Sequence, residues 1–344
     1  MKLGVLECFF GSPWSAEDRF SYADFLEKNN FSFYIYAPKA DHFLRKKWSQ
    51  EWPETYLDEL QLMATHFQDR GVKFGIGLSP MGIQDDFSGK KDLLIKRTKQ
   101  LNGIGVDTLG IFFDDMPCTD HLAEQQLEVL DVVSRHGDAK LLFCPSYYSY
   151  DPILDQVFGQ RPENYLEEIG RHLPAEIDIA WTGPKVISEE IGLEHLQAVT
   201  KTIQRTPLLC DNFFANDGPK NCKFLKIKAL TGRSGGAPVS AWAFNPMNQP
   251  NLSKIVLLAS KAVLLENAAP DIALTTALEI LCGRVLAEKI EHYKTGFLEL
   301  GLNASLEKLG HWQQEFSRQE DSFSREIFYW LTGKYSVGPE CLTD

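Results

Sequence analysis

The chain has 344 residues, of which 44% are hydrophobic and 24% are charged, as expected of a globular protein that can bury a large core. A formal net charge of −12 and the lack of a basic segment argue against a nucleic-acid partner. No stretch is long enough to cross a membrane, and Glu7 interrupts the first apolar run too early for a signal peptide. We therefore expect a cytoplasmic protein with no membrane contact.

Apolar runs alternate with amphipathic stretches through most of the chain. We expect strands at residues 3–8, 31–36, 73–78, 109–113, 140–145, 177–181, 207–211 and 239–244. We expect helices near residues 15–28, 54–70, 91–103, 121–135, 164–172, 193–204 and 252–265. About eight strand–helix units predict an α/β fold, a (β/α)₈ TIM barrel, with a doubly wound open sheet as the competing fold.

The pattern changes at about Pro270. Residues 271–335 contain no strand-like run, and apolar residues such as Leu274, Leu278 and Leu281 keep helical spacing. We expect a barrel domain over residues 1–268 and an appended C-terminal helical region over residues 269–344. This region could pack on the barrel, line a substrate groove or form a homodimer with a second copy.

The seven cysteines are too scattered for a disulfide framework. Cys8, Cys144 and Cys210 lie in or just after apolar runs, so we expect reduced thiols in the core or in a pocket. No Cys/His spacing indicates a zinc site, and we expect neither a metal nor a cofactor. The basic residues of the third helix, Lys90 to Lys99, alternate with apolar ones, which is typical of a solvated helix face.

Polar or aromatic residues follow the apolar runs, at the positions that meet at the carboxyl-terminal face of a barrel. They are Lys39, Asp114, Asp115, Tyr147, Tyr148, Tyr150, Trp181, Asp211, Asn212 and Asn245. Hydroxyl-binding groups beside flat aromatic rings suggest a sugar pocket. Adjacent carboxylates such as Asp114 and Asp115 disfavour joint ionisation, and a protonated acid beside an anion suits glycosidic-bond chemistry. The alternative is a strand end whose acids are simply solvated.

Several segments resemble, in the same order, the motifs of family 84 glycoside hydrolases, the O-GlcNAcase and bacterial β-N-acetylglucosaminidase group. Residues 4–14 resemble that family's "GVVEGFYGxPW" opening, and residues 34–39 resemble its "YAPKDD", with Ala40 in place of the first acid. Residues 113–115 match "FDD", residues 181–186 match "WTGPKV", residues 211–217 match "DNxxAND", and residues 245–246 match "NP".

The resemblance implies a (β/α)₈ barrel with retaining exo-β-N-acetylglucosaminidase activity on a β-GlcNAc-bearing glycan or glycoprotein. The substrate's own 2-acetamido carbonyl attacks the anomeric carbon in this family, so no enzyme nucleophile is used. By motif, Asp114 would polarise the acetamide and Asp115 would be the general acid and base. Lys39, Asp217 and Asn245 would bind sugar hydroxyls, and Asn212 and Tyr148 would lie near the acetamide and the scissile oxygen.

Two departures from the family pattern matter for the pocket. Cys8 replaces a glycine of the opening motif, and Cys210 replaces the aromatic residue before "DN", where a tryptophan would help enclose the acetyl group. A side chain at position 8 narrows the pocket wall, whereas loss of a ring at position 210 opens space. Two alternatives therefore stay open: a hydrolase for a different N-acylated or modified amino sugar, and a catalytically silent carbohydrate-binding protein.

Overall fold

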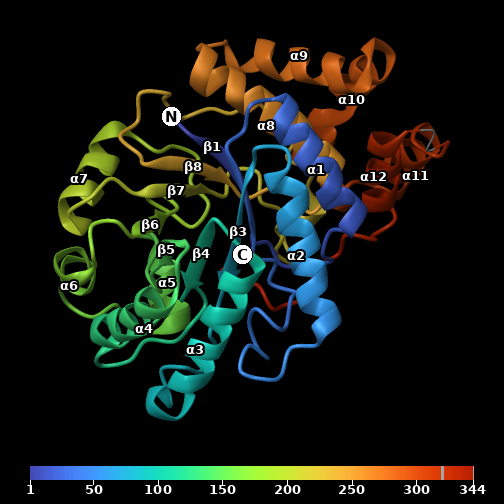
Figure 1. The fold of residues 1–344 in the computed structure, drawn as a ribbon. Coiled ribbons are helices and arrows are strands. Elements are labelled where there is room, and N and C mark those ends of the chain that lie inside the picture. The colour runs from blue at the N-terminus through green and yellow to red at the C-terminus, as the bar shows by residue number, and fades with distance from the viewer. Residues whose placement is uncertain (319–320, 344) are drawn as a thin grey trace.

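The computed structural model describes residues 1–318 and 321–343, and Figure 1 shows their fold. Eight parallel strands within these residues pair in sequence order and close into a barrel, in which β1 also pairs with β8. The strands are β1 (Leu3–Glu7), β2 (Phe33–Tyr36), β3 (Lys73–Leu78), β4 (Thr108–Phe112), β5 (Lys140–Cys144), β6 (Asp178–Trp181), β7 (Leu208–Asp211) and β8 (Ala241–Phe244). The predicted TIM barrel is confirmed, and the open sheet is excluded.

The strands are buried on both faces, which explains why their sequences are continuously apolar. Small side chains such as Ala37, Ala180 and Ala243 pack with Leu6 and Phe112 inside the barrel. The barrel interior is therefore filled by side chains below the level at which the strands end.

Helices surround the barrel on its outer side (Figure 1). They are α1 (Ala16–Lys28), α2 (Glu54–Gln68), α3 (Phe87–Ile104), α4 (Leu122–His136), α5 (Pro152–Phe158), α6 (Tyr165–His172), α7 (Leu193–Ile203) and α8 (Pro250–Glu266), with a short 3₁₀ turn, η1 (Asn221–Lys223). Sequence analysis missed α5, which spans only seven residues and begins with Pro152 after the capping residue Asp151. In these residues no helix combines the length and apolar character needed to cross a bilayer.

The prediction of a solvated basic face on α3 is wrong for Arg97. This side chain is fully buried, and its guanidinium lies over the Trp52 ring. Its Nε donates a hydrogen bond to the Trp48 carbonyl at 2.6 Å, and Nη2 donates to the Gln50 carbonyl. The irregular segment between β2 and α2 therefore packs against α3. The helical periodicity of α3 does not reveal this tertiary contact.

The appended helices are α9 (Pro270–Cys282), α10 (Arg284–Glu299), η2 (Gly301–Asn303), α11 (Leu306–Glu315) and α12 (Ser322–Leu331). In Figure 1 they lie on one side of the barrel, and α9 packs along α8. Trp330 of α12 donates a hydrogen bond to the Cys222 carbonyl at 2.9 Å. Glu326 accepts backbone hydrogen bonds from Asn251 and Leu252 at the start of α8, each at 2.8 Å. The expected boundary at residue 268 falls between α8 and α9; separate domains stay a prediction.

Candidate active site

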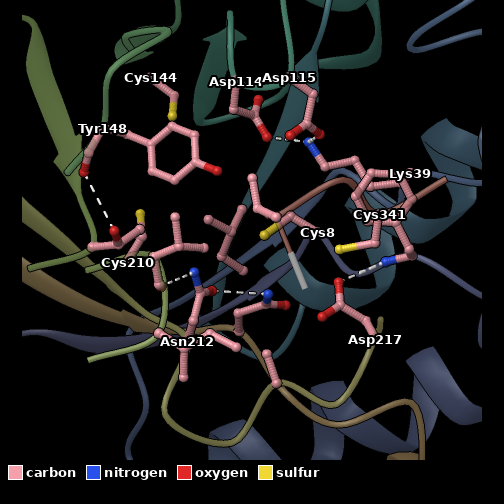
Figure 2. Close-up of a pocket in the computed structure, with 18 of the residues that line it drawn as sticks. Cys8, Lys39, Asp114, Asp115, Cys144, Tyr148, Cys210, Asn212, Asp217 and Cys341 are labelled. Atoms are coloured by element: carbon pink, nitrogen blue, oxygen red, sulfur yellow. Dashed lines mark hydrogen bonds and ion pairs between the residues drawn. The ribbon is translucent and has the colours of Figure 1, made fainter. Parts of the chain in front are cut away.

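One cavity, of about 80 Å³, opens at the carboxyl-terminal ends of the strands. The structure brings all nine predicted site residues to its wall: Cys8, Lys39, Asp114, Asp115, Tyr148, Cys210, Asn212, Asp217 and Asn245. Figure 2 labels all of these except Asn245. Four other strand-end residues, Tyr147, Tyr150, Trp181 and Asp211, are not among the lining residues, so their expected place in the pocket is wrong. Asp211 is fully buried in an ion pair with Arg233. Tyr147 instead donates a hydrogen bond to the Gly159 carbonyl, and Trp181 is fully buried.

Asp114 and Asp115 follow directly after β4 and both reach Lys39. The Lys39 ammonium forms an ion pair with Asp114 Oδ2 and lies 3.4 Å from Asp115 Oδ2. Burial alone would lower the pKa of Lys39, but the two carboxylates raise it above its ordinary value. Asp114 Oδ1 is buried and accepts no hydrogen bond from any described residue. One oxygen of Asp114 is therefore held by Lys39, and the other remains available as an acceptor.

The backbone at Asp115 explains how two successive side chains reach one cavity. In a regular strand, neighbouring side chains point to opposite faces. Asp115 has a φ of +64°, a left-handed conformation that is uncommon outside glycine but more accessible to Asp than to most residues. Such a conformation costs about 1–3 kcal/mol and persists only where the surroundings hold it. It ends the alternation of β4, and both carboxylates line the cavity.

Arg45 is a neighbour of Asp115 that sequence analysis missed. Its Nη2 lies 3.2 Å from Asp115 Oδ2, and both side chains are about 9% exposed. Burial raises the pKa of Asp115, with Asp114 acting in the same direction, while Lys39 and Arg45 oppose the shift. Arg45 lies six residues beyond Lys39 in an irregular segment. It does not directly follow a strand, so the search for polar residues at strand ends did not find it.

The two asparagines orient each other at the ends of β7 and β8. Asn212 Nδ2 donates to the Val186 carbonyl at 2.8 Å, and Asn212 Oδ1 accepts from Asn245 Nδ2 at 3.0 Å. Asn245 Oδ1 is buried, and no described residue donates to it. It is a second fixed acceptor in the cavity.

Asp217 joins the loop after β7 to the loop after β1. Its Oδ2 accepts a hydrogen bond from the Phe10 amide at 2.9 Å. Burial raises the pKa of this carboxyl, and the hydrogen bond from Phe10 partly opposes the shift. Asp217 therefore fixes the wall that carries Cys8.

Apolar side chains and thiols form another part of the wall. Cys8, Cys144 and Cys210 line the cavity with Leu6 and Ala180. Burial raises the pKa of all three thiols, so they are neutral near pH 7. Together with Cys118, Cys222 and Cys282 they are free thiols, as the scattered spacing predicts. Cys144 was expected in the core or a pocket but was not named as a binding residue.

The cavity also contains residues from far along the chain. Cys341 and Thr343, beyond α12, contribute to its lining. Burial raises the pKa of the Tyr148 hydroxyl, and a hydrogen bond with the Thr343 side chain partly opposes this. The sequence carries no signal for this placement. Among described residues, no three His, Cys, Asp or Glu side chains are grouped as a metal site would require.

A family model described as beta-N-acetylglucosaminidase matches residues 3–293, which is most of the chain. The chain belongs to the β-N-acetylglucosaminidase family. The members of this family are glycoside hydrolases, so the cavity described above is a candidate active site of that enzyme class.

The chain is similar to proteins from two mammals. The chain is 31% identical over 238 residues to Protein O-GlcNAcase from Rattus norvegicus and, equally, from Mus musculus. The match covers 64% of this chain and 25% of each relative, so it spans about a quarter of their length.

A solved structure shares the fold. A mutant of the Thermobaculum terrenum O-GlcNAc hydrolase superposes with a TM-score of 0.78 at 27% identity, over 96% of this chain and 80% of that one. The architecture of this β-N-acetylglucosaminidase family member, including its appended helices, therefore agrees with that of a bacterial O-GlcNAc hydrolase.

Proposed function

We propose that this chain is a retaining exo-β-N-acetylglucosaminidase that uses the 2-acetamido group of its substrate as the nucleophile. The observation that carries the proposal is Asp114 Oδ1, a buried acceptor without a partner among the described residues, beside a second carboxyl. A glycosidase with its own nucleophile would place two carboxyl groups on either side of the bond. Here both acids follow one strand and share Lys39, an arrangement suited to one acid serving the substrate's amide.

Asp114 would accept the acetamido N–H through Oδ1. This contact turns the acetamide so that its carbonyl oxygen approaches the anomeric carbon from the face opposite the leaving group. As that oxygen bonds to the anomeric carbon, positive charge develops on the amide, and the neighbouring carboxylate stabilises it. Lys39 holds Asp114 Oδ2 and so leaves Oδ1 to the substrate.

Asp115 would be the general acid and base. Its raised pKa, which burial causes, favours the protonated form that must give its proton to the departing glycosidic oxygen. The resulting carboxylate then takes a proton from water, which attacks the anomeric carbon of the cyclic intermediate and reopens it. Two inversions at one carbon give overall retention.

The remaining polar groups would bind the sugar ring. Asn245 Oδ1 offers an acceptor to a hydroxyl group, and Asp217 offers its carboxyl group at the other side of the cavity. Asn212 would contact the acetamide region, and Tyr148 would lie near the scissile oxygen. Lys39 was predicted to bind a hydroxyl; its two ion pairs suggest that it also positions the acids.

Hydrolysis of 4-nitrophenyl β-N-acetylglucosaminide tests the proposal. Asp115→Ala should lower kcat/KM by about 10²–10⁴-fold, the usual contribution of general acid–base catalysis. Asp85→Ala is the matched control: Asp85 and Asp86 are also adjacent aspartates, but they are exposed and lie outside the cavity, so turnover should be unchanged. Proton NMR of the first product should show the β-anomer. No turnover by the wild type, or equal turnover in Asp115→Ala, would contradict the proposal.

A second candidate is a hydrolase for a sugar with a larger N-acyl group. Cys8, Cys144, Cys210 and Ala180 leave a wall of small side chains, in which Cys210 occupies a position where the family has an aromatic ring. Comparison of N-acetyl, N-propionyl and N-butyryl substrates separates the candidates. Cys210→Trp should then favour N-acetyl over N-butyryl by about tenfold or more in kcat/KM, since a misplaced methylene changes discrimination by roughly 10–200-fold. An unchanged ratio would exclude position 210 as a determinant.

We also propose a reducing compartment such as the cytoplasm, which the free thiols of the cavity support.

A homodimer through the C-terminal helices is a further proposal. It is supported by exposed apolar side chains on α9 and α10: Ile272, Ile280 and Val285. Light scattering after size-exclusion chromatography measures the mass directly, and a concentration-independent monomer would refute the dimer.

A further inference from the structure

We propose that residues 337–343 form an autoinhibitory strap, which occupies the sugar site and must leave before substrate enters. The inference rests on the proposed function for its meaning, because the strap covers the acids assigned to catalysis. It concerns a segment that lies beyond the part of the chain matched by the family model, which ends at residue 293.

The strap begins at a fixed point. Helix α12 is held to the barrel by Glu326 and Trp330, and Tyr335 packs against the core. Val337 then meets the loop after β1: a Cβ built on Gly11 would lie only 3.0 Å from Val337 Cγ2. Gly11 has a φ of +105°, so its glycine both permits the turn and leaves room for Val337.

The end of the strap enters the cavity with alternating side chains. Cys341 and Thr343 line the cavity and are half-buried, whereas Leu342 between them is 57% exposed. Turns at residues 339–340 and 342–343 carry the chain across the mouth of the cavity, with Leu342 exposed between two lining residues. In Figure 2 the Cys341 side chain is directed into the cavity, on the side that carries Cys8 and Asp217. Thr343 forms its hydrogen bond with Tyr148.

The remaining space is too small for the proposed substrate. The cavity measures about 80 Å³ with the strap in place, whereas pockets for small molecules are typically roughly 300–1,000 Å³. With the strap in place, the side chains of Lys39, Asp114 and Asp115 are only 5%, 15% and 9% exposed, which leaves a sugar little access to the acids. Entry therefore requires the strap to move.

Displacement of the strap is structurally undemanding. Residues 332–343 contain neither helix nor strand, so no hydrogen-bonded ladder has to break. Leu342 is largely exposed, so its burial contributes little free energy to the closed position of the strap. If the open form makes up about a tenth of the molecules, the apparent affinity for substrate is about tenfold below its intrinsic value.

A pair of tryptophan substitutions tests the strap in the full chain. Cys341→Trp places a ring where the cavity has no room and should hold the strap open, whereas Leu342→Trp at the adjacent exposed position is the matched control. With 4-nitrophenyl β-N-acetylglucosaminide, KM should fall about tenfold in Cys341→Trp, with kcat preserved, and remain unchanged in Leu342→Trp. An unchanged KM in Cys341→Trp would overturn the proposal. A raised KM would make the segment part of the binding site and would also overturn it.

A second readout needs no substrate. Alkylation of Cys8 by iodoacetamide, followed by mass spectrometry of its peptide, should be several-fold faster in Cys341→Trp than in Leu342→Trp. Buried Cys222 serves as the internal control for intact folding and should react equally slowly in both. Equal Cys8 rates refute the strap even if the enzyme hydrolyses the substrate. Faster Cys8 alkylation without turnover by any variant would instead support the strap and refute the proposed activity.

Discussion

Substitution of Arg45 tests the electrostatics of the acid pair. Arg45→Met keeps an aliphatic side chain against the Phe10 ring, over which the guanidinium now lies at 5.2 Å, but removes the charge 3.2 Å from Asp115 Oδ2. Arg45 favours the ionised form of Asp115, so its loss should raise the pKa of Asp115 further. A general acid acts while it is protonated, and the alkaline limb of the kcat/KM profile should therefore move to higher pH.

The size of this shift follows from the geometry. Two unit charges 3.2 Å apart interact by about 5 kcal/mol at an effective dielectric constant of roughly 20, which corresponds to an upper limit of nearly four pH units. An arginine beside a carboxyl shifts its pKa by about 1–3 units in practice. Lys39 remains 3.4 Å from the same oxygen, so we expect about 1–2 units for Arg45→Met.

The assay is a pH profile of kcat/KM for 4-nitrophenyl β-N-acetylglucosaminide. Arg45→Lys is the matched control, because it retains a positive charge and should shift the alkaline limb by less than Arg45→Met. An alkaline limb that stays at the wild-type position in Arg45→Met would refute the assignment of that limb to Asp115. An equal shift in both variants would show that the guanidinium geometry, rather than its charge, sets the pKa.

Two further predictions concern stability. Arg233→Met should lower the free energy of unfolding by about 3–5 kcal/mol in urea titrations, because it removes the ion-pair partner of fully buried Asp211. Lys96→Met breaks an exposed pair and should leave the free energy of unfolding nearly unchanged. Burial raises the pKa of Glu326 from 4.5 to about 7, so its contribution to stability is complete below pH 4.5 and is lost as pH rises through 7. The unfolding free energy of wild type relative to Glu326→Gln should therefore fall by about 3 kcal/mol across this range, and a pH-independent difference would contradict it.

The barrel was predictable because parallel strands have a simple sequence pattern. A strand buried on both faces is continuously apolar. The range of β3 is as predicted, and the ends of the other strands lie within one or two residues of their predicted positions. The helix α5 and the burial of Arg97 were not predictable in the same way. A seven-residue helix shows little periodicity, and the contacts of Arg97 come from a segment about 50 residues earlier in the chain.

The cavity divides into a part that sequence reasoning located and a part that it did not. Side chains at strand ends, such as Asp114 and Asn245, were placed correctly because barrel topology alone brings strand ends together. Arg45 reaches Asp115, and Cys341 reaches the cavity, from irregular segments whose paths depend on side-chain packing rather than on a repeating pattern. Sequence analysis wrongly placed Tyr147 and Tyr150 in the cavity. Both follow a strand end, but proximity to a strand end does not determine where a side chain points.

These two parts of the cavity have different consequences for the enzyme. In the proposed mechanism, the strand-end groups would provide an acceptor for the acetamide and an acid for the leaving oxygen, and barrel topology alone brings these groups together. The groups from irregular segments act on that chemistry: Arg45 opposes protonation of Asp115, and Cys341 and Thr343 restrict entry. Substitutions at Arg45 should therefore move the pH profile, and substitutions in residues 337–343 should move KM. Only loss of the strand-end acids should abolish turnover, so the three measurements separate catalysis, its tuning and access to the site.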